Sequence, residues 1–537
     1  MKLDNIKKIE RVLFMAAIIT LPFTCLPNII ANYFSGRLST NILLLLILIE
    51  SYEIFKYKSK INKRLLCFIL IFVLWNIISE LFNILNFGYW DFLYLTNIEK
   101  LDSINIFSIE KEKFYVIFYL LRNIAKILLN YITCFGLVYS IWHIYSNNWE
   151  KAFNDIKYSL MILFSMMGIY SFVEMLWIKF DFIIARNFLT FINPFFFEPA
   201  SKSGWWPPLL WDNQLRSLCV EPSFFGILAS LITPLLWYKI LKNTNFVTCF
   251  FTFYFSVMIF MTNARTAILL LIGEVIILFL LNFLYTSKEI LKKSFIIFIT
   301  ILTAFMTNIL IEKGVVEKLE NDCISKIYTI KIINGSNITE INNHTQFEKS
   351  KKNEVFSKID NKSINANNEI LGYLDKNIYS VVQKNQRSNA TRLNIMKTHI
   401  NMGNDNILLG KGYNTYIPYM ERYLPNDINN DKELNGFIKD IHNKGFIKAG
   451  YPTVNQFTFI YATSGLIGLI IFLIPIFYVV IYLKKLYKYV EGSIFIFLVC
   501  AFAASVVAMF SAEAFYSYYL LLGLIYLLIE NYNKHKF

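Results

Sequence analysis

The chain has 537 residues, a formal net charge of +14, 56% hydrophobic residues and 17% aromatic residues. Ordinary soluble domains are about 45–50% apolar, so this composition excludes a soluble globular protein and indicates a chain that crosses a membrane several times. The positive charge does not indicate binding to nucleic acid. Most of the excess lies in short loops between apolar segments, where the rules of membrane insertion account for it.

Apolar stretches of about 20 residues are long enough to cross a bilayer as helices, and they predict about 12 transmembrane helices. In chain order they cover 11–33, 39–56, 66–86, 114–142, 157–180, 216–238, 246–263, 265–285, 294–311, 453–483, 492–510 and 513–530. The predicted fold is therefore an all-α polytopic membrane protein. One large loop outside the membrane, 312–452, separates helices one to nine in 1–311 from the last three in 453–537.

Basic residues in the short loops predict the orientation of the chain. With this set of helices, the basic clusters all fall on the same face as both termini: Lys56, Lys58, Lys60, Lys63 and Arg64; Lys239 and Lys242; Lys288, Lys292 and Lys293; Lys484, Lys485 and Lys488. Basic loops stay in the cytoplasm, so both termini are expected there and the large loop outside. No small-residue cleavage site follows the first apolar stretch, so the first helix is expected to be retained.

The cysteines and histidines give no pattern of ligands or disulfides. All cysteines except Cys323 fall in apolar helices, and the 5 histidines are scattered. No disulfide framework, metal site or cofactor is therefore expected.

The large loop has two parts of different character. Its first part, 312–388, is rich in Asn, Lys and Ser, lacks apolar periodicity and is expected to be flexible. Its second part, 389–452, is expected to be ordered and to lie over the membrane domain as a lid. It contains a predicted helix, 391–400, and a glycine turn at 408–413. A shorter outside loop, 181–215, is rich in aromatic residues and is expected to lie at the bilayer interface.

Two short runs place ionisable side chains at the outer ends of predicted helices. Arg216 and Glu221 lie in the run 216–226, where the sixth helix begins, and Arg265 lies in the turn 262–267 between the seventh and eighth helices. Ionisable groups at membrane depth are costly and are functional candidates by default. The structural alternative is an arginine that reaches to the surface and a glutamate at the interface.

Arg392, in the predicted helix of the large loop, adds a third guanidinium on the outer side. Guanidinium groups donate paired hydrogen bonds to phosphate oxygens and stay charged. If Arg216, Arg265 and Arg392 converge, they would suit a lipid-linked pyrophosphate. Their spacing in the sequence does not show whether they converge.

Short motifs occur in a fixed order around these residues: Glu221-Pro222-Ser223-Phe224-Phe225 in the run 216–226; Asn263-Ala264-Arg265-Thr266 before an apolar helix; Arg392 followed by Leu409-Gly410-Lys411-Gly412-Tyr413; and Asn455-Gln456-Phe457 before Ser464-Gly465-Leu466-Ile467-Gly468. Their order and spacing resemble the O-antigen polymerase and ligase superfamily, over 216–272 and 389–475. The resemblance implies a metal-independent glycosyltransferase at the outer face of the bacterial cytoplasmic membrane. Such an enzyme transfers glycan from an undecaprenyl-pyrophosphate donor.

The resemblance also implies roles for the candidate residues. Arg216, Arg265 and Arg392 would bind the pyrophosphate and stabilise the charge that develops on it as the sugar leaves, with Arg265 as the catalytic arginine. A base must take the proton of the acceptor hydroxyl, and Glu221 is the candidate, because partial burial raises the pKa of a carboxyl group.

One departure from the family pattern bears on the reaction. Ligases of the superfamily typically carry a histidine just before the asparagine at the start of the helix after the loop, where this chain has Val454 followed by Asn455. The nearest His-Asn pair is His442-Asn443. Polymerase is therefore the better fit, and His399, His442 and Asn455 remain as further candidates.

The sequence thus predicts a polymerase that extends a capsule or O-antigen-type polysaccharide from lipid-linked repeat units in the bilayer. A flippase and a chain-length regulator are the implied protein partners. The first alternative is a ligase that attaches finished glycan to a lipid, a wall polymer or a protein. The second is a transporter of lipid-linked oligosaccharide, which would show inverted repeats and charges deep in several helices. No repeat is evident, and most charged candidates lie at the outer ends of helices; Glu174, Arg122 and Lys126 are the exceptions.

Overall fold

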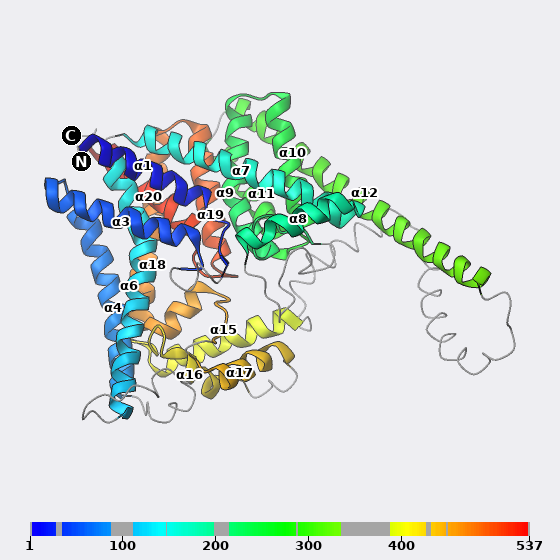
Figure 1. Ribbon diagram of the computed structural model, residues 1–537. Coiled ribbons are helices and arrows are strands. Elements are labelled where there is room, and N and C mark those ends of the chain that lie inside the picture. Colours follow the sequence, from blue (N-terminus) through cyan, green and yellow to red (C-terminus); the bar gives the residue numbers. More distant parts are fainter. Residues whose placement is uncertain are drawn as a thin grey trace.

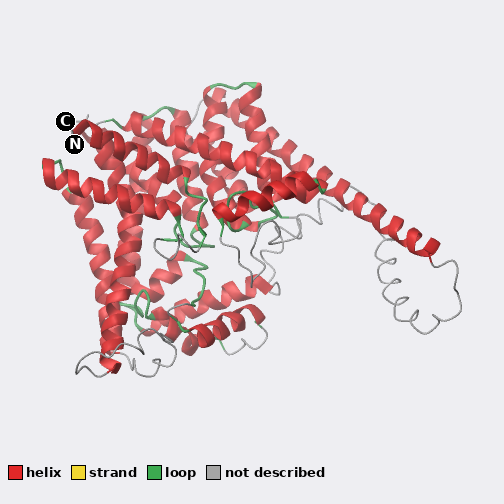
Figure 2. Ribbon diagram, viewed as in Figure 1, coloured by secondary structure: helices red, strands yellow, loops and turns green. Residues whose placement is uncertain are grey.

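The computed structural model describes residues 3–27, 35–86, 111–146, 148–197, 214–285, 288–333, 387–425, 431–446 and 449–534. Within these ranges the chain is helical and has no strand, which confirms the all-α prediction (Figure 2). The helices are α1 (Leu3–Ile19), α3 (Leu38–Tyr57), α4 (Lys63–Asn86), α6 (Lys111–Tyr145), α7 (Trp149–Phe180), α8 (Ile183–Phe196), α9 (Pro222–Lys242), α10 (Phe246–Met261), α11 (Arg265–Tyr285), α12 (Lys288–Ile333), α15 (Arg387–Asp405), α16 (Tyr416–Tyr419), α17 (Lys432–Lys444), α18 (Gln456–Tyr489), α19 (Gly492–Ala508) and α20 (Tyr516–Lys534).

Every predicted transmembrane segment overlaps one of these helices. Eight of the described helices, namely α3, α4, α6, α7, α9, α11, α12 and α18, are long and apolar enough to cross a membrane, and α10 and α19 are shorter apolar helices. The most enclosed is α9, with 89% of its apolar window buried, against 22–50% in the other seven. The run that carries Glu221 therefore leads into the centre of the membrane body.

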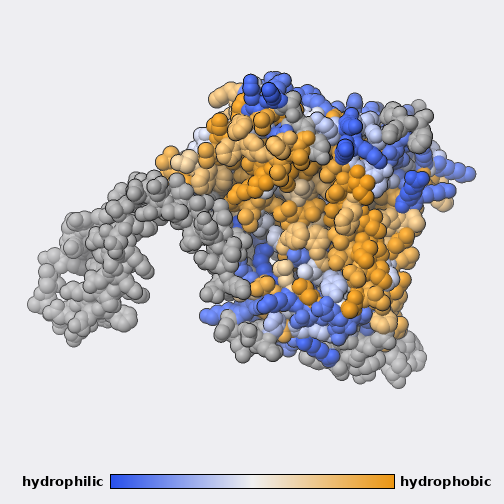
Figure 3. Space-filling model, turned by 180° about the vertical axis from the view of Figure 1, so that it is seen from behind, coloured by the Kyte–Doolittle hydropathy of each residue, from blue (hydrophilic) through white to orange (hydrophobic). Residues whose placement is uncertain are grey.

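The outer helices form a separate layer. Figure 1 shows α15, α16 and α17 side by side at the end of the molecule opposite to the two termini, and α4 and α6 reach from the body to this layer. Figure 3 shows apolar side chains across the middle of the body and hydrophilic ones at its two ends. We call the described residues 387–425 and 431–446, which cover most of the predicted lid 389–452, the lid.

The first helix differs from its predicted bounds. The sequence suggested 11–33, whereas α1 begins at Leu3 and ends at Ile19, before Pro22. Charged residues at its start do not exclude it from the body because they have partners there. Arg11 pairs with Asp155 of α7, and Lys7 contacts Glu53 of α3 at 2.7 Å.

Two further segments depart from the predicted layout. The loop 181–215 contains a helix, α8, whose buried positions Ala185, Leu189 and Asn193 recur every four residues, whereas Ile183 and Phe191 are about 70% exposed. An amphipathic helix of this kind suits a membrane interface. In the large loop, α12 continues to Ile333, past the predicted boundary at 312. The rest of the part expected to be flexible, 334–386, lies outside the described residues.

The lid is fixed to the body by backbone hydrogen bonds around three glycines. The backbone N–H groups of Lys411 and Gly412 donate to the carbonyl oxygens of Ala462 and Thr463 at 2.7 and 2.8 Å. Gly465 bends α18 at a φ of 65°, a conformation that favours glycine, and a Cβ there would lie 2.2 Å from the Leu408 carbonyl oxygen. The glycine turn predicted at 408–413 therefore forms the junction between the lid and α18.

Candidate functional site

Glu221 lies at the start of α9, on the side of the membrane body that faces the lid. It is in an extended conformation, and Pro222 occupies the first helical position, where its fixed φ and missing N–H suit a helix start. The carboxylate accepts a hydrogen bond from the Ser223 hydroxyl at 3.1 Å. Burial raises the pKa of Glu221 above its ordinary value, while the hydrogen bond from Ser223 and the positive charge of Arg392 oppose that rise. Glu221 is therefore half-buried and has a raised pKa.

Arg265 is the first residue of α11 and points towards the lid. The turn before it is closed by Asn263, which has a left-handed φ of 48°, and by the Thr262 hydroxyl, which accepts the Ala264 N–H at 3.1 Å. Nη1 of Arg265 donates to Oδ1 of Asn389 in α15 at 2.9 Å. The lid and the turn therefore meet at Arg265.

Arg392 lies one helical turn after Asn389 on α15. Its Nη1 donates to the carbonyl oxygen of Ser511, in the turn between α19 and α20, at 2.9 Å. The charge of Arg392 acts on both Glu221 and Arg265. The structure thus brings together three predicted residues, Glu221, Arg265 and Arg392, from helices far apart in the sequence.

A close contact between α9 and α11 sets the distance between the helix starts that carry Glu221 and Arg265. Gly226 lies about one turn after Glu221, and Ala267 lies two residues after Arg265. A Cβ on Gly226 would lie 2.5 Å from Cβ and 2.6 Å from Cα of Ala267, so only glycine allows α9 and α11 to approach this closely. Sequence reasoning did not single out Gly226, although it ends the 216–226 run.

Arg216 pairs with Glu174 of α7. It is 2% exposed, its Nε lies 3.7 Å from Oε1 of Glu174, and its guanidinium stacks over the ring of Phe197 at 5.3 Å. The backbone N–H groups of Arg216 and Ser217 donate to Oε2 of the same glutamate at 3.2 and 2.7 Å. The charges that act on Glu221 come from Arg392 and Glu433, whereas Nη1 of Arg216 donates to the carbonyl oxygen of Val220, the residue before Glu221, at 3.5 Å. Arg216 therefore lies beside the group and its charge is paired with Glu174. Glu174 is its partner, which the sequence noted only as a charge deep in a helix.

The remaining candidates have distinct places. His399 of α15 is 1% exposed between the rings of Tyr416 and Phe459, and burial lowers its pKa to about 4, so it is neutral at pH 7. Asn455 caps α18 by accepting the Thr458 N–H at 3.0 Å, and its amide donates to the Phe510 carbonyl at 3.2 Å. His442, on α17, is exposed and lies 2.7 Å from Glu421, within the lid.

The turn 509–515, between α19 and α20, connects these parts. Besides accepting from Arg392 and Asn455, it accepts the Gln456 N–H at the Met509 carbonyl, at 2.8 Å. Its Ala514 N–H donates to the Gln456 side chain at 2.9 Å, and Glu513 forms an ion pair with Arg37. The only signal of this turn in the sequence is the polar stretch from Ser511 to Glu513 between two apolar runs.

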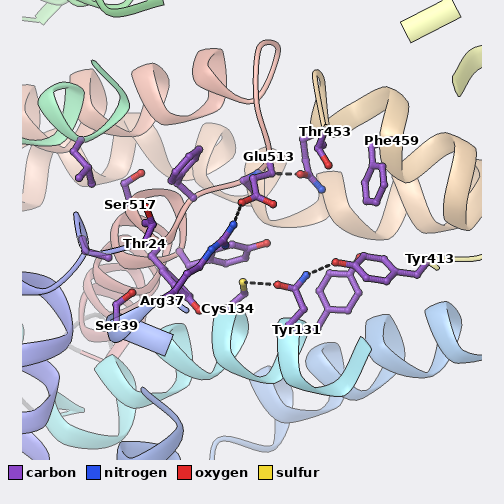
Figure 4. A pocket seen from close by; sticks show the side chains of 18 residues that line it. Thr24, Arg37, Ser39, Tyr131, Cys134, Tyr413, Thr453, Phe459, Glu513 and Ser517 are labelled. Atoms are coloured by element: carbon purple, nitrogen blue, oxygen red, sulfur yellow. Dashed lines mark hydrogen bonds and ion pairs between the residues drawn. The ribbon is translucent and has the colours of Figure 1, made fainter. Parts of the chain in front are cut away.

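A polar cavity of about 60 Å³ lies beside this turn (Figure 4). The Arg37–Glu513 ion pair crosses it on one side. On the other side, the Asn130 amide of α6 donates to the hydroxyl of Tyr413, from the glycine turn of the lid, at 2.7 Å. The cavity is therefore lined by the membrane body and the lid together.

One cluster among the described residues has the geometry of metal ligands, but a lysine fills it. The ligand atoms of Glu10, Glu53 and His143 lie within 4.8 Å of one another, at the end of the molecule near the termini. The Lys7 ammonium contacts all three, at 3.2, 2.7 and 3.1 Å respectively. A positive charge from the chain itself thus occupies the position that a cation would take.

Comparison with known families gives a match over part of the chain. Residues 250–473 match the model of a family described as O-antigen ligase. The matched range contains Arg265, Arg392, Asn455 and the lid, and it begins after Glu221. No curated protein matches the chain. The match confirms the resemblance for the motifs from Asn263 onward, whereas the motif 221–225 lies outside the matched range.

Proposed function

We propose that this chain, whose residues 250–473 match the model of a family described as O-antigen ligase, is a polysaccharide polymerase. It would transfer glycan from an undecaprenyl-pyrophosphate-linked donor to a lipid-linked acceptor repeat unit. The reaction would take place at the outer face of the bacterial cytoplasmic membrane, with both termini inside. The product would be a capsule or O-antigen-type polysaccharide.

The observation that carries this proposal is the meeting of Arg265, Arg392 and Glu221 between the membrane body and the lid. Burial and then the positive charge of Arg392 lower the pKa of Arg265. An arrangement that holds two like charges together is stabilised by an anion bound between them, and a pyrophosphate offers the oxygens that guanidinium groups bind best. Two guanidinium groups at this place support a site in which a pyrophosphate leaving group would be stabilised by charges already in position.

The proposed reaction is a single displacement. The acceptor hydroxyl oxygen forms a bond to the anomeric carbon of the donor sugar, and the bond from that carbon to the pyrophosphate oxygen breaks. Glu221 takes the proton of the hydroxyl, and the lipid pyrophosphate leaves with both bonding electrons. Arg265 and Arg392 stabilise the negative charge that develops on it. Arg216 would act indirectly, by holding in place the run 216–226 that carries Glu221.

The direct test compares purified wild type with Arg265→Ala on short-chain lipid-pyrophosphate repeat units. The loss of one charge-assisted contact to the leaving group should lower polymer formation by about 100- to 1,000-fold. Arg186→Ala is the matched control, because Arg186 is an exposed arginine of α8 that stacks on Trp177 at 5.9 Å. If neither wild type nor Arg265→Ala makes polymer, or both make it equally well, the proposal fails.

The description of the matched family favours a ligase as the second candidate. The structure shows Val454, 5% exposed, at the position where ligases of the superfamily typically carry histidine, and His399 nearby is buried and neutral. A strain that lacks the gene separates the two activities. Loss of a polymerase leaves single lipid-linked repeats, whereas loss of a ligase leaves long unattached chains. We expect single repeats.

A further inference from the structure

A second, much larger cavity lies at the other end of the molecule. Its volume is about 910 Å³, and it is bounded by the α3–α4 turn, α4, α6, α18 and α20. Figure 1 shows the α3–α4 turn and the last turns of α6 and α20 at the end where the two termini lie, away from the lid. A volume of this size falls within the range of about 300–1,000 Å³ typical of ligand pockets. The proposed function does not use this cavity.

The inner wall of the cavity is apolar and aromatic. It is made by Leu65, Phe68, Phe135, Val138, Trp142, Ile474, Pro475, Tyr478, Leu522 and Tyr526. Ile474 of α18 is 48% exposed and offers apolar surface to the cavity, whereas Phe135, Val138 and Trp142, on one face of α6, are each at most 2% exposed and close its floor. Such a wall favours hydrocarbon over water.

The rim of the cavity is basic, and its charge is not neutralised. Lys60, Lys63 and Arg64 are exposed, and none of them forms an ion pair with a residue that the structure describes. The lining contains one carboxylate, Glu530, which lies 3.5 Å from Lys534 and accepts a hydrogen bond from Asn62 at 3.4 Å. Lys60, Lys63 and Arg64 therefore line the cavity as exposed cations without a carboxylate partner among the described residues.

We propose that this cavity binds an anionic phospholipid from the leaflet on the side of the termini. The phosphate would lie among Lys60, Lys63 and Arg64, and the acyl chains would lie along the wall formed by α6 and α18. Basic pockets between transmembrane helices bind anionic head groups because each lysine or arginine near the surface attracts them by about 1 kcal/mol. A zwitterionic lipid offers the same chains but no net charge to this rim.

The experiment uses the full chain, stripped of lipid in detergent and examined by native mass spectrometry. Phosphatidylglycerol and phosphatidylcholine with the same chains are added at equal concentration. Wild type is expected to retain phosphatidylglycerol over phosphatidylcholine. The variant Lys60→Gln/Lys63→Gln/Arg64→Gln should bind phosphatidylglycerol at least about tenfold more weakly. The control, Lys484→Gln/Lys485→Gln/Lys488→Gln, removes three exposed lysines of α18 that do not line the cavity, and it should behave like wild type.

Three results would overturn the proposal. Equal retention of the two lipids by wild type would show that the basic rim does not select for an anionic head group. Equal losses in the two triple variants would show a diffuse attraction and no site. Equal binding of dihexanoyl and long-chain phosphatidylglycerol would show that the apolar wall is not used. If the cavity variant fails to fold, Arg64→Gln and Lys485→Gln give the same comparison, with a drop of about fivefold expected for Arg64→Gln alone.

Discussion

Glu221→Gln should lower the rate of polymer formation by about 100- to 10,000-fold, because the amide cannot take the proton of the acceptor hydroxyl. The variant keeps the size of the side chain and can still accept the hydrogen bond that Ser223 donates at 3.1 Å. Donor binding should change little, since Arg265 and Arg392 are untouched. Single-turnover rates and donor affinity, measured separately, check the two halves of this expectation.

The pH dependence gives Glu221 its own signature. Only the carboxylate can act as a base, and burial raises its pKa in the folded protein. The rate should therefore rise with pH through a value above the ordinary 4.5 and level off beyond it. In terms of stability the sign is opposite, since a raised pKa favours the folded state at low pH and that contribution is lost as pH rises.

Glu433→Gln is the matched control for Glu221→Gln. Glu433 begins α17 and its charge acts on Glu221, but its carboxylate lies against the Thr391 hydroxyl at 3.4 Å. We expect Glu433→Gln to keep the rate within a few-fold of wild type. The rise of the rate with pH should shift to slightly lower pH, because the loss of a negative neighbour lowers the pKa of Glu221. Wild-type turnover in Glu221→Gln would rule out Glu221 as the base.

Gly226→Ala should lower turnover by about 100-fold, although Gly226 touches no proposed substrate, since a displacement of 1 Å in a reacting geometry can cost that much. The added Cβ would meet Cβ and Cα of Ala267 at 2.5 and 2.6 Å, and backbone cannot move aside as a flexible side chain can. The helices α9 and α11 must then separate, which moves Glu221 away from Arg265. Overpacking of this kind also costs about 1–3 kcal/mol of stability.

The control is Gly273→Ala, on α11 itself, where an added Cβ would meet nothing within 4 Å. Alanine is the better helix former by about 1 kcal/mol, so this variant should melt no lower than wild type and turn over at the wild-type rate. Turnover is compared per folded molecule, isolated by size exclusion in detergent. Equal rates in the two alanine variants would show that the α9–α11 spacing does not control the reaction.

The sequence was sufficient to predict those helices and turns that depend on a single segment of the chain. Runs of about 20 apolar residues form helices in a membrane whatever their neighbours, so the segments around α9, α11 and α18 were found. The same holds for the helix around Arg392 and for the glycine turn at 408–413. Helix limits were less well predicted when charges were involved. The start of α1 depends on partners such as Asp155, which lies far away in the sequence.

The parts of the site that the sequence did not reveal all depend on contacts between distant segments. Whether Arg265 and Arg392 face each other is decided by the packing of α15 on the body. The partner of Arg216 could not be identified either, because Glu174 lies in the middle of an apolar helix and its orientation is not visible from spacing. The amphipathic helix α8 was not predicted, because the aromatic residues on its exposed face were interpreted as residues at the bilayer interface.

The turn 509–515 holds several elements with a few backbone atoms, and this has a consequence for how the protein can vary. Ser511 fixes the direction of Arg392, Phe510 fixes the cap at Asn455, and Glu513 fixes Arg37. A change in the length or shape of this turn alters all three contacts at once. Substitutions at Arg392, Asn455 and Arg37 will therefore not be additive with substitutions in the turn, although these residues lie on different helices. We expect these positions to covary with the turn among related sequences.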